Sequence, residues 1–228
     1  MKKKFFAFFI ILPLLAAGLF FAACDGEKGE DTPKENNVIV CLGDSLTAGF
    51  GATVPNVDDK TKSYPAFLQE KVKIPVINAG VSGNTTANAL ARLDSDVLSH
   101  SPKVVVIILG ANDIFNEVNL AITEMNYKSI MNKIDNGKRK IYLAKFYTDA
   151  IALQLLVMYP DVDLDAYNAM YTTLASSPNV ELIEDIWDGI WGIYMSDFVH
   201  PNATGYELMA GNIFKEMEPY LTSNGFVK

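Results

Sequence analysis

Residues 104–109 read VVVIIL, a run in which every side chain is apolar. A strand with one face in water alternates apolar and polar residues, whereas a central strand of a parallel sheet is covered by helices on both faces and is apolar throughout. The run therefore predicts a central parallel strand. Four more short, largely apolar segments predict its partner strands, at residues 38–42, 76–78, 140–145 and 180–183.

Longer segments with helical spacing of apolar residues separate these strands. They cover residues 64–72, 86–99, 119–135, 163–176 and 203–221. Two of them follow favourable capping residues, Ser63 before Tyr64-Pro65 and Thr85 before Thr86. Strands that alternate with helices are typical of βαβ units. We therefore predict an α/β fold in which five parallel strands form the middle layer of a three-layer α/β/α sandwich.

The first 24 residues have the layout of a secretion signal. Lysines occupy positions 2–4, and residues 5–23 carry no charge and end in small side chains before Cys24. The apolar stretch is also long enough for a transmembrane helix. However, Pro13 and Gly18 interrupt it and no basic cluster follows it, which favours a processed signal.

Residues 21–24, FAAC, resemble a bacterial lipoprotein cleavage box, except that phenylalanine takes the usual place of leucine. The resemblance implies a signal peptide over residues 1–24 and a lipid on Cys24. The polar stretch 25–36, DGEKGEDTPKEN, predicts a flexible tether, and residues 37–224 predict the folded domain. We expect the domain to lie outside the cytoplasm, anchored by lipid to a membrane of the bacterial cell envelope, with plain secretion as the alternative.

Charge and ligand counts exclude several partners. Without residues 1–23 the chain carries 16 basic and 27 acidic residues, a net charge of −11, which repels phosphate backbones and anionic lipid head groups. Nucleic acid is therefore excluded as a partner, and membrane attachment would come from the lipid. The other cysteine, Cys41, lies in the first strand and is expected to be a buried thiol. Two distant histidines and no cysteine pair predict no metal site, and no cofactor is expected.

Polar loops follow four of the five strands. They read GDSL at residues 43–46, GVSGN at 80–84, GAND at 110–113 and DFVHP at 197–201. Parallel strands bring such loops to one edge of the sheet, where open α/β sheets bind ligands. A hydroxyl, a glycine, an amide and an imidazole are thus expected at a single edge.

In these loops the chain resembles the SGNH hydrolase superfamily, also called GDSL esterases, over residues 37–221. The matching residues, in the family's order, are Gly43-Asp44-Ser45-Leu46, Gly83 within Ser-Gly-Asn, Gly110-x-Asn112-Asp113 and Asp197-x-x-His200-Pro201. The resemblance implies a flavodoxin-like sandwich with strand order 2-1-3-4-5, one of the few orders that right-handed crossovers permit.

The resemblance also implies a role for each residue. Ser45 is the nucleophile, His200 is the base that takes its proton, and Asp197 is the carboxylate that holds the other ring nitrogen. The oxyanion hole consists of the backbone N–H groups of Ser45 and Gly83 and the side-chain amide of Asn112.

Other features of these loops have simpler interpretations. Asp44 and Asp113 are expected to hold loop backbone, and His100 fits a helix C-terminus, so none of them is assigned to catalysis. The chain has no G-x-S-x-G, which argues against the nucleophile elbow of α/β-hydrolases. Residues 45–49, SLTAG, are weakly similar to a phosphate-binding loop, but such a loop would leave the amide and the imidazole without a purpose.

These roles imply a serine esterase that hydrolyses carboxylic esters or thioesters through an acyl-enzyme, in the manner of lysophospholipases and thioesterases. Two alternatives stay open: a carbohydrate O-acetylesterase of the cell envelope, and a non-catalytic envelope lipoprotein that binds a glycan or a protein. The expected partner is a small ester, either an acyl ester or an acetylated sugar. Residues 150–159, AIALQLLVMY, either wall an acyl-chain pocket or form a buried helix that packs on the sheet.

Overall fold

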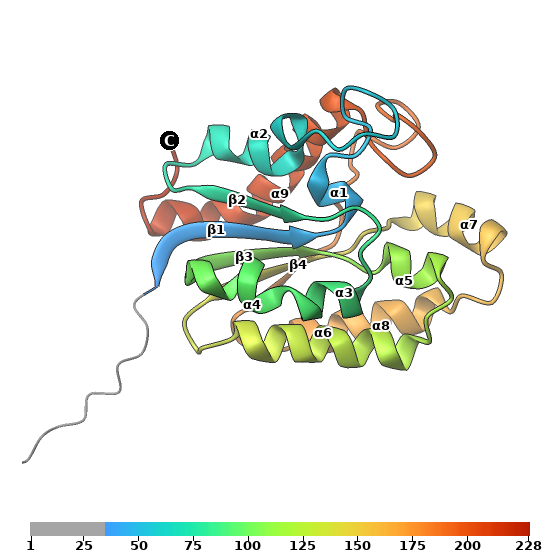
Figure 1. Ribbon diagram of the computed structural model, residues 1–228, viewed down its shortest axis with the longest axis horizontal. Coiled ribbons are helices and arrows are strands. Elements are labelled where there is room, and N and C mark those ends of the chain that lie inside the picture. The colour runs from blue at the N-terminus through green and yellow to red at the C-terminus, as the bar shows by residue number, and fades with distance from the viewer. Residues whose placement is uncertain (1–34) are drawn as a thin grey trace, which may run out of the picture. The chain divides into compact units, whose positions relative to one another are not determined.

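The computed structural model describes residues 35–228. Its sheet consists of five strands, β1 (Asn36–Gly43), β2 (Val76–Gly80), β3 (Pro102–Ile108), β4 (Lys140–Ala144) and β5 (Val180–Ile183). They lie in the order β2-β1-β3-β4-β5, and every neighbouring pair is parallel. The predicted fold class and strand order are confirmed (Figure 1).

β3 lies in the middle of the sheet because its sequence suits burial on both faces. All of its side chains from Val104 to Ile108 are completely buried. In the register of the sheet, Val105 lies between Val40 of β1 and Ile141 of β4. Full burial of an aliphatic side chain of this size contributes about 1.5–3 kcal/mol, so a run of them stabilises the strand most at the centre.

Helices cover both faces of the sheet (Figure 1). On one face α2 (Tyr64–Lys71) packs against α9 (Ala203–Ser223). The other face is covered by α3 (Thr86–Ala91), α4 (Leu93–Asp96), α6 (Leu120–Ile134) and α8 (Leu164–Ala175). A further helix, α7 (Asp149–Met158), lies near the end of the sheet toward which the strands point. The three-layer arrangement is therefore as predicted.

The prediction of one helix over residues 86–99 is wrong. The segment forms α3, then α4, then a short 3-10 helix at Leu98–His100. The first break falls at Arg92, whose backbone angles (φ −105°, ψ 7°) leave the helical region. Its side chain donates to backbone carbonyls at the ends of two strands, and this long-range contact has no trace in the local helical pattern.

Two short helices were not predicted, α1 (Ser45–Ala48) and α5 (Ala111–Phe115). Both begin directly after a strand, inside the polar loops. Helices of this length have too few residues for a periodic pattern. Their position matters for function, because the first turn of a helix leaves backbone N–H groups without intrahelical partners.

Contacts with the rest of the fold continue past residue 224. Val227 forms an antiparallel bridge with Val72, and the N–H of Lys73 donates to Phe226 O at 2.7 Å. Both contacts lie where β2 begins, at the end of the sheet opposite to the polar loops.

No helix within residues 35–228 has the length and apolar character needed to cross a membrane. Over the same residues, no group of histidine, cysteine, aspartate and glutamate side chains has the arrangement of a metal site. Cys41 is a free, buried thiol, and burial raises its pKa to about 12. The expected signal peptide, the lipidation site Cys24 and most of the expected tether lie outside the described residues.

Candidate active site

The turn between β1 and α1 carries Ser45 at the edge where the strands end, which we call the carboxyl edge; the opposite one is the amino edge. Asp44 caps α1, since its Oδ1 accepts the N–H of Leu46 at 3.1 Å. Gly43 is required at the end of β1, because a Cβ there would collide with the side chain of Thr47. Ser45 is half-buried, and the main chain on both sides of it is fixed by these contacts.

The loop between β5 and α9 places His200 against this serine. Its Nε2 lies 2.8 Å from Ser45 Oγ, and its Nδ1 lies 2.8 Å and 3.0 Å from the two carboxylate oxygens of Asp197. An ionised carboxylate only accepts hydrogen bonds, so Nδ1 carries the proton and Nε2 presents a lone pair to the hydroxyl. The structure thus brings the three predicted residues of the Ser-His-Asp set into one chain of hydrogen bonds.

Asp197 is itself held in place. Its Oδ1 accepts the N–H groups of Val199 at 2.8 Å and of His200 at 2.7 Å. Partial burial acts to raise the pKa of Asp197, but these hydrogen bonds and the imidazole outweigh it, and the pKa lies below its ordinary value. The carboxylate is therefore ionised at neutral pH and able to stabilise an imidazolium. Phe50 packs against the imidazole with a centroid separation of 4.5 Å, which restricts the ring.

The predicted oxyanion residues lie on the neighbouring loops. Asn112 is in the first turn of α5, and its Nδ2 donates to Asn84 O at 3.1 Å and to Asp44 Oδ2 at 3.2 Å. Gly83, which precedes Asn84, is exposed and has a φ of +79°. Its N–H has no hydrogen-bond partner within residues 35–228. Oxyanion donors bond to the substrate oxygen rather than to the serine, and the role of Gly83 and Asn112 as such donors stays a prediction.

The two aspartates of these loops have structural contacts. Burial raises the pKa of Asp44 to about 7, against hydrogen bonds from the Leu46 N–H and the Asn112 amide that favour its charged form. Asp113 is also buried and accepts from the N–H and the hydroxyl of Thr86, at 2.9 Å and 2.6 Å. Asp44 thus stabilises the turn that carries Ser45, and Asp113 connects α5 to the start of α3 through its hydrogen bonds with Thr86.

An apolar cavity opens beside the reactive pair. Residues that neighbour Ser45 and His200 in the sequence, Leu46 and Val199, form part of its wall. α7 supplies one side and aromatic rings supply much of the rest. The full lining consists of Leu46, Ala111, Phe115, Phe146, Ile151, Gln154, Leu155, Met158, Trp187, Trp191, Phe198 and Val199. Residues 150–159 fit parts of both interpretations: Ile151 and Leu155 of α7 belong to the buried core and also line the cavity, while Leu153 and Val157 are exposed. Whether the cavity receives an acyl chain stays a prediction.

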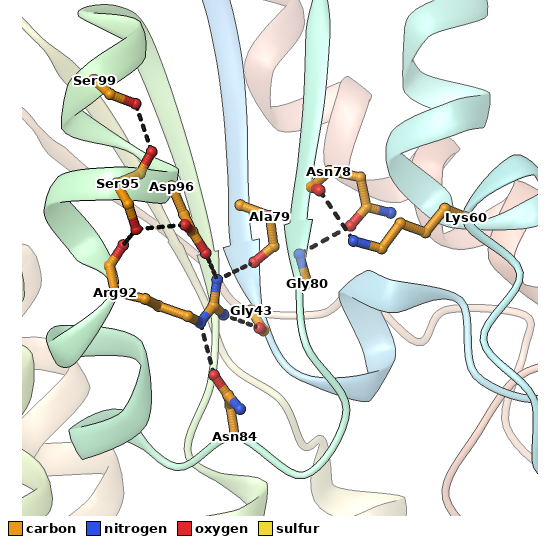
Figure 2. Close-up of polar contacts among 10 residues, drawn as sticks. All are labelled: Gly43, Lys60, Asn78, Ala79, Gly80, Asn84, Arg92, Ser95, Asp96 and Ser99. Atoms are coloured by element: carbon orange, nitrogen blue, oxygen red, sulfur yellow. Dashed lines mark hydrogen bonds and ion pairs between the residues drawn. The ribbon is translucent and has the colours of Figure 1, made fainter.

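Sequence reasoning missed three residues of this region. Trp187 and Trp191 follow β5, and their rings pack edge to face at 5.6 Å; Nε1 of Trp187 donates to Phe146 O at 2.9 Å. Two tryptophans four residues apart in a loop were the available signal. The third is Arg92, a lone arginine inside an otherwise regular helical pattern, whose contacts Figure 2 shows.

Comparison with known proteins agrees with this arrangement. Residues 41–208 match the model of the GDSL-like Lipase/Acylhydrolase family. The chain is 26% identical over 191 residues to Esterase TesA of Pseudomonas aeruginosa, with 80% of this chain and 89% of that protein covered. It is also 26% identical over 188 residues to the Escherichia coli protein named Thioesterase 1/protease 1/lysophospholipase L1, with 80% and 84% covered. The crystal structure of the lipase/acylhydrolase from Enterococcus faecalis has a TM-score of 0.65 at 24% identity, over 85% of this chain and 98% of that one, and so has the same fold.

Proposed function

The chain belongs to the GDSL-like lipase/acylhydrolase family and is a serine hydrolase of esters, and we propose that it acts on acyl esters or thioesters with Ser45 as nucleophile. The observation that carries the assignment of the nucleophile is the pair of short contacts on His200, 2.8 Å from Nε2 to Ser45 Oγ and 2.8 Å from Nδ1 to Asp197. Such a pair is what activates a hydroxyl of otherwise weak nucleophilicity.

The proposed reaction has two halves. In the first, Ser45 Oγ attacks the ester carbonyl while Nε2 of His200 takes its proton; the tetrahedral intermediate then expels the alcohol or thiol, which receives that proton. In the second, water attacks the acyl-enzyme with the same imidazole as base, and Ser45 leaves with the proton. Asp197 stabilises the imidazolium in both halves.

Negative charge appears on the carbonyl oxygen in both halves. The proposed donors are the N–H groups of Ser45 and Gly83 and the amide of Asn112. The N–H of Gly83 supports this, because it has no partner within residues 35–228 and is open to a substrate oxygen. The Asn112 amide donates to Asn84 O at 3.1 Å and to Asp44 Oδ2 at 3.2 Å, so in this proposal it exchanges one of these bonds for the oxyanion.

The apolar cavity supports an acyl chain, rather than a sugar, on the acid side of the ester. Its lining contains one polar side chain, Gln154, and several large apolar ones. A sugar that entered it would lose hydrogen bonds to water without replacement. A methylene group gains about 0.8 kcal/mol on leaving water, so kcat/KM should rise about fourfold for each carbon that fits.

Two experiments test the proposal together. A fluorophosphonate probe should label the wild type and not Ser45→Ala, because only an activated serine attacks phosphorus. Across a series of p-nitrophenyl esters from acetyl to long acyl chains, kcat/KM should then rise until the cavity, about 40 Å³ in volume, is filled. Equal labelling of both proteins would refute the nucleophile. A flat series, with faster release of acetate from acetylated xylose oligomers, would favour the O-acetylesterase alternative.

We also propose that the protein is exported and anchored by lipid on Cys24. The support is the sequence alone, the uncharged stretch 5–23 followed by FAAC at 21–24. The chain offers a matched control, since its only other cysteine is the buried Cys41. Metabolic labelling with an alkyne fatty acid should be lost in Cys24→Ser and kept in Cys41→Ser. Labelling that persists in Cys24→Ser would refute the anchor.

A further inference from the structure

The chain contains only two arginines, and both donate to backbone carbonyls of the sheet region. Arg139 does so at the amino edge, where Nε donates to Pro102 O and Nη1 donates to Ile134 O, each at 3.0 Å. Arg92 lies at the carboxyl edge, between α3 and α4, and only 16% of its side chain is exposed. The two residues thus allow the same side chain to be compared at the two edges.

The guanidinium of Arg92 joins three segments of the proposed active site (Figure 2). Nη2 donates to Gly43 O at 2.8 Å and Nη1 to Ala79 O at 2.7 Å, so the ends of β1 and β2 share one cation. Nε donates to the side-chain oxygen of Asn84 at 2.7 Å. Gly43 lies two residues before Ser45, and Asn84 directly follows Gly83, so the contacts flank two of the proposed oxyanion donors.

An acidic neighbour fixes the orientation of the guanidinium. Asp96, one turn further along, accepts from Nη1 of Arg92 at 2.9 Å. Ser95 Oγ in turn donates to Asp96 Oδ1 at 2.6 Å, and Ser99 Oγ donates to Ser95 O at 2.5 Å (Figure 2). The hydrogen bond from Ser95, together with the neighbouring Arg92, holds the pKa of Asp96 below its ordinary value. The guanidinium of Arg92 is therefore paired with an ionised carboxylate, whose position is fixed by the hydrogen bond from Ser95.

Asn84 is held from both sides. Its side chain accepts from Arg92, and its backbone carbonyl accepts from the Asn112 amide at 3.1 Å. A displacement of Asn84 would move the N–H of Gly83 and the amide of Asn112 together. The loop has a second tie to the nucleophile turn, because the N–H of Val81 donates to Gly43 O at 3.2 Å.

We propose that Arg92 is a positioning residue of the oxyanion hole. Its guanidinium holds the loop that carries Gly83 at a fixed place relative to the turn that carries Ser45, so that the donors converge on one oxygen. This inference rests on the proposed function. The planar guanidinium presents donors in several fixed directions, whereas a lysine ammonium is a single nitrogen and cannot reach Gly43 O, Ala79 O and Asn84 together.

The main test compares Arg92→Lys with Arg139→Lys on p-nitrophenyl butyrate. Misplacement of a catalytic group by about 1 Å costs about 10²-fold. We expect kcat of Arg92→Lys to fall by about that factor with KM within about threefold, because the bound ester is unchanged and only the oxyanion loses support. Arg139→Lys should keep kcat within about twofold while unfolding at a lower urea concentration, since its contacts lie at the other edge.

A transition-state analogue separates positioning from general loosening. An alkyl trifluoromethyl ketone adds to the serine and forms an oxyanion, so its inhibition constant should rise in Arg92→Lys by the factor lost in kcat/KM. The corresponding alkyl methyl carbinol forms no oxyanion, and its affinity should not change. Equal weakening of both compounds would indicate a damaged pocket and overturn the proposal.

Asn84→Ala provides a second test of the proposal, which applies if Arg92→Lys does not fold. It removes only the side-chain acceptor of Nε, and we expect a smaller fall in kcat, about tenfold, again without a matching rise in KM. An unchanged kcat in Asn84→Ala, or a kcat of Arg92→Lys no lower than that of Arg139→Lys, would overturn the inference. If the wild type itself is no faster than Ser45→Ala, the proposed function fails instead, and the two failures are thereby distinguished.

Discussion

The two edges of the sheet carry one histidine and one arginine each, and they use these residues differently. At the carboxyl edge, the ring of His200 joins two side chains, Ser45 and Asp197. At the amino edge, His100 lies in the 3-10 helix before β3, where its carbonyl oxygen accepts from the side chain of Asn36 at 2.9 Å. The first arrangement leaves a lone pair directed at a hydroxyl, and the second only completes the hydrogen bonding of the backbone.

The two arginines differ between the edges in the same way as the two histidines. Arg139 at the amino edge binds two carbonyl oxygens that have no link to the reactive groups. Arg92 binds the ends of two strands and, through Asn84, the loop of Gly83, whose N–H has no partner in the part of the chain that the structure describes. We infer that polar residues at the amino edge stabilise the fold, while those at the carboxyl edge position donors and a base. Substitution should then reduce stability at one edge and turnover at the other.

The largest contrast is expected between the two histidines. His200→Ala removes the base, and loss of such a group from a catalytic set costs about 10⁶-fold in kcat. His100→Ala should leave kcat unchanged, because only the backbone of that residue is used. Steady-state rates with circular dichroism as a check on folding measure both. A comparable loss in His100→Ala would contradict the division between the edges.

The next contrast is between two asparagines. Asn112→Ala deletes a proposed oxyanion donor and should lower kcat by about 10²–10³-fold. Asn36→Ala deletes a hydrogen bond of similar length to the His100 carbonyl and should change stability by about 1 kcal/mol with no loss of rate. If Asn112→Ala raised KM instead of lowering kcat, Asn112 would act on substrate binding and its assignment to the oxyanion would be wrong.

A pH contrast concerns Asp44. Its pKa is raised from 3.8 to about 7 by burial, so between these values the unfolded chain has released the proton that the folded chain retains. The free energy of unfolding of the wild type should therefore fall, relative to Asp44→Asn, as pH rises from about 4 to about 7 and level off above. We expect a relative fall of roughly 3–4 kcal/mol. Urea unfolding of both proteins across this range measures it, and a difference independent of pH would rule out a protonated Asp44.

The smallest contrast is between two phenylalanines. Phe115 lines the apolar cavity and stacks on Tyr159 at a centroid separation of 5.6 Å, and Tyr159 borders a second hollow together with Met158. Phe115→Ala should join the two hollows and shift the preferred acyl chain to a longer one, with about tenfold better kcat/KM for the longer ester. Phe226→Ala, at the amino edge, should lower stability and leave the preference unchanged. An unchanged preference in Phe115→Ala would show that the ring does not limit chain length.

The sheet was predictable from the sequence because its information is local. Runs such as 104–109 are apolar on both faces, and the rule that parallel strands end at one edge then places Ser45, Asn112 and His200 near one another. The strand order needed the family resemblance as well. The same local logic fails for residues 86–99, where the helix breaks at Arg92 to reach carbonyls 13 and 49 residues away.

The cavity was also out of reach of local reasoning. Its wall combines α1, α5, α7 and two loops, and the roles of Trp187 and Phe198 depend on which segments the fold brings beside Ser45. The apolar stretch at 150–159 could be noticed, but not which of its faces is covered. The reactive residues that follow each strand can be identified from the sequence. The shape of a cavity between loops that are distant in the sequence cannot.

Both ends of the folded domain leave it at the amino edge. β1 begins there at Asn36, and the bridge between Val72 and Val227 holds the C-terminus beside the start of β2 (Figure 1). A linker, a bead or a fusion partner attached to either end is therefore attached on the side remote from Ser45. Immobilised or surface-displayed forms should therefore keep full access to bulky esters.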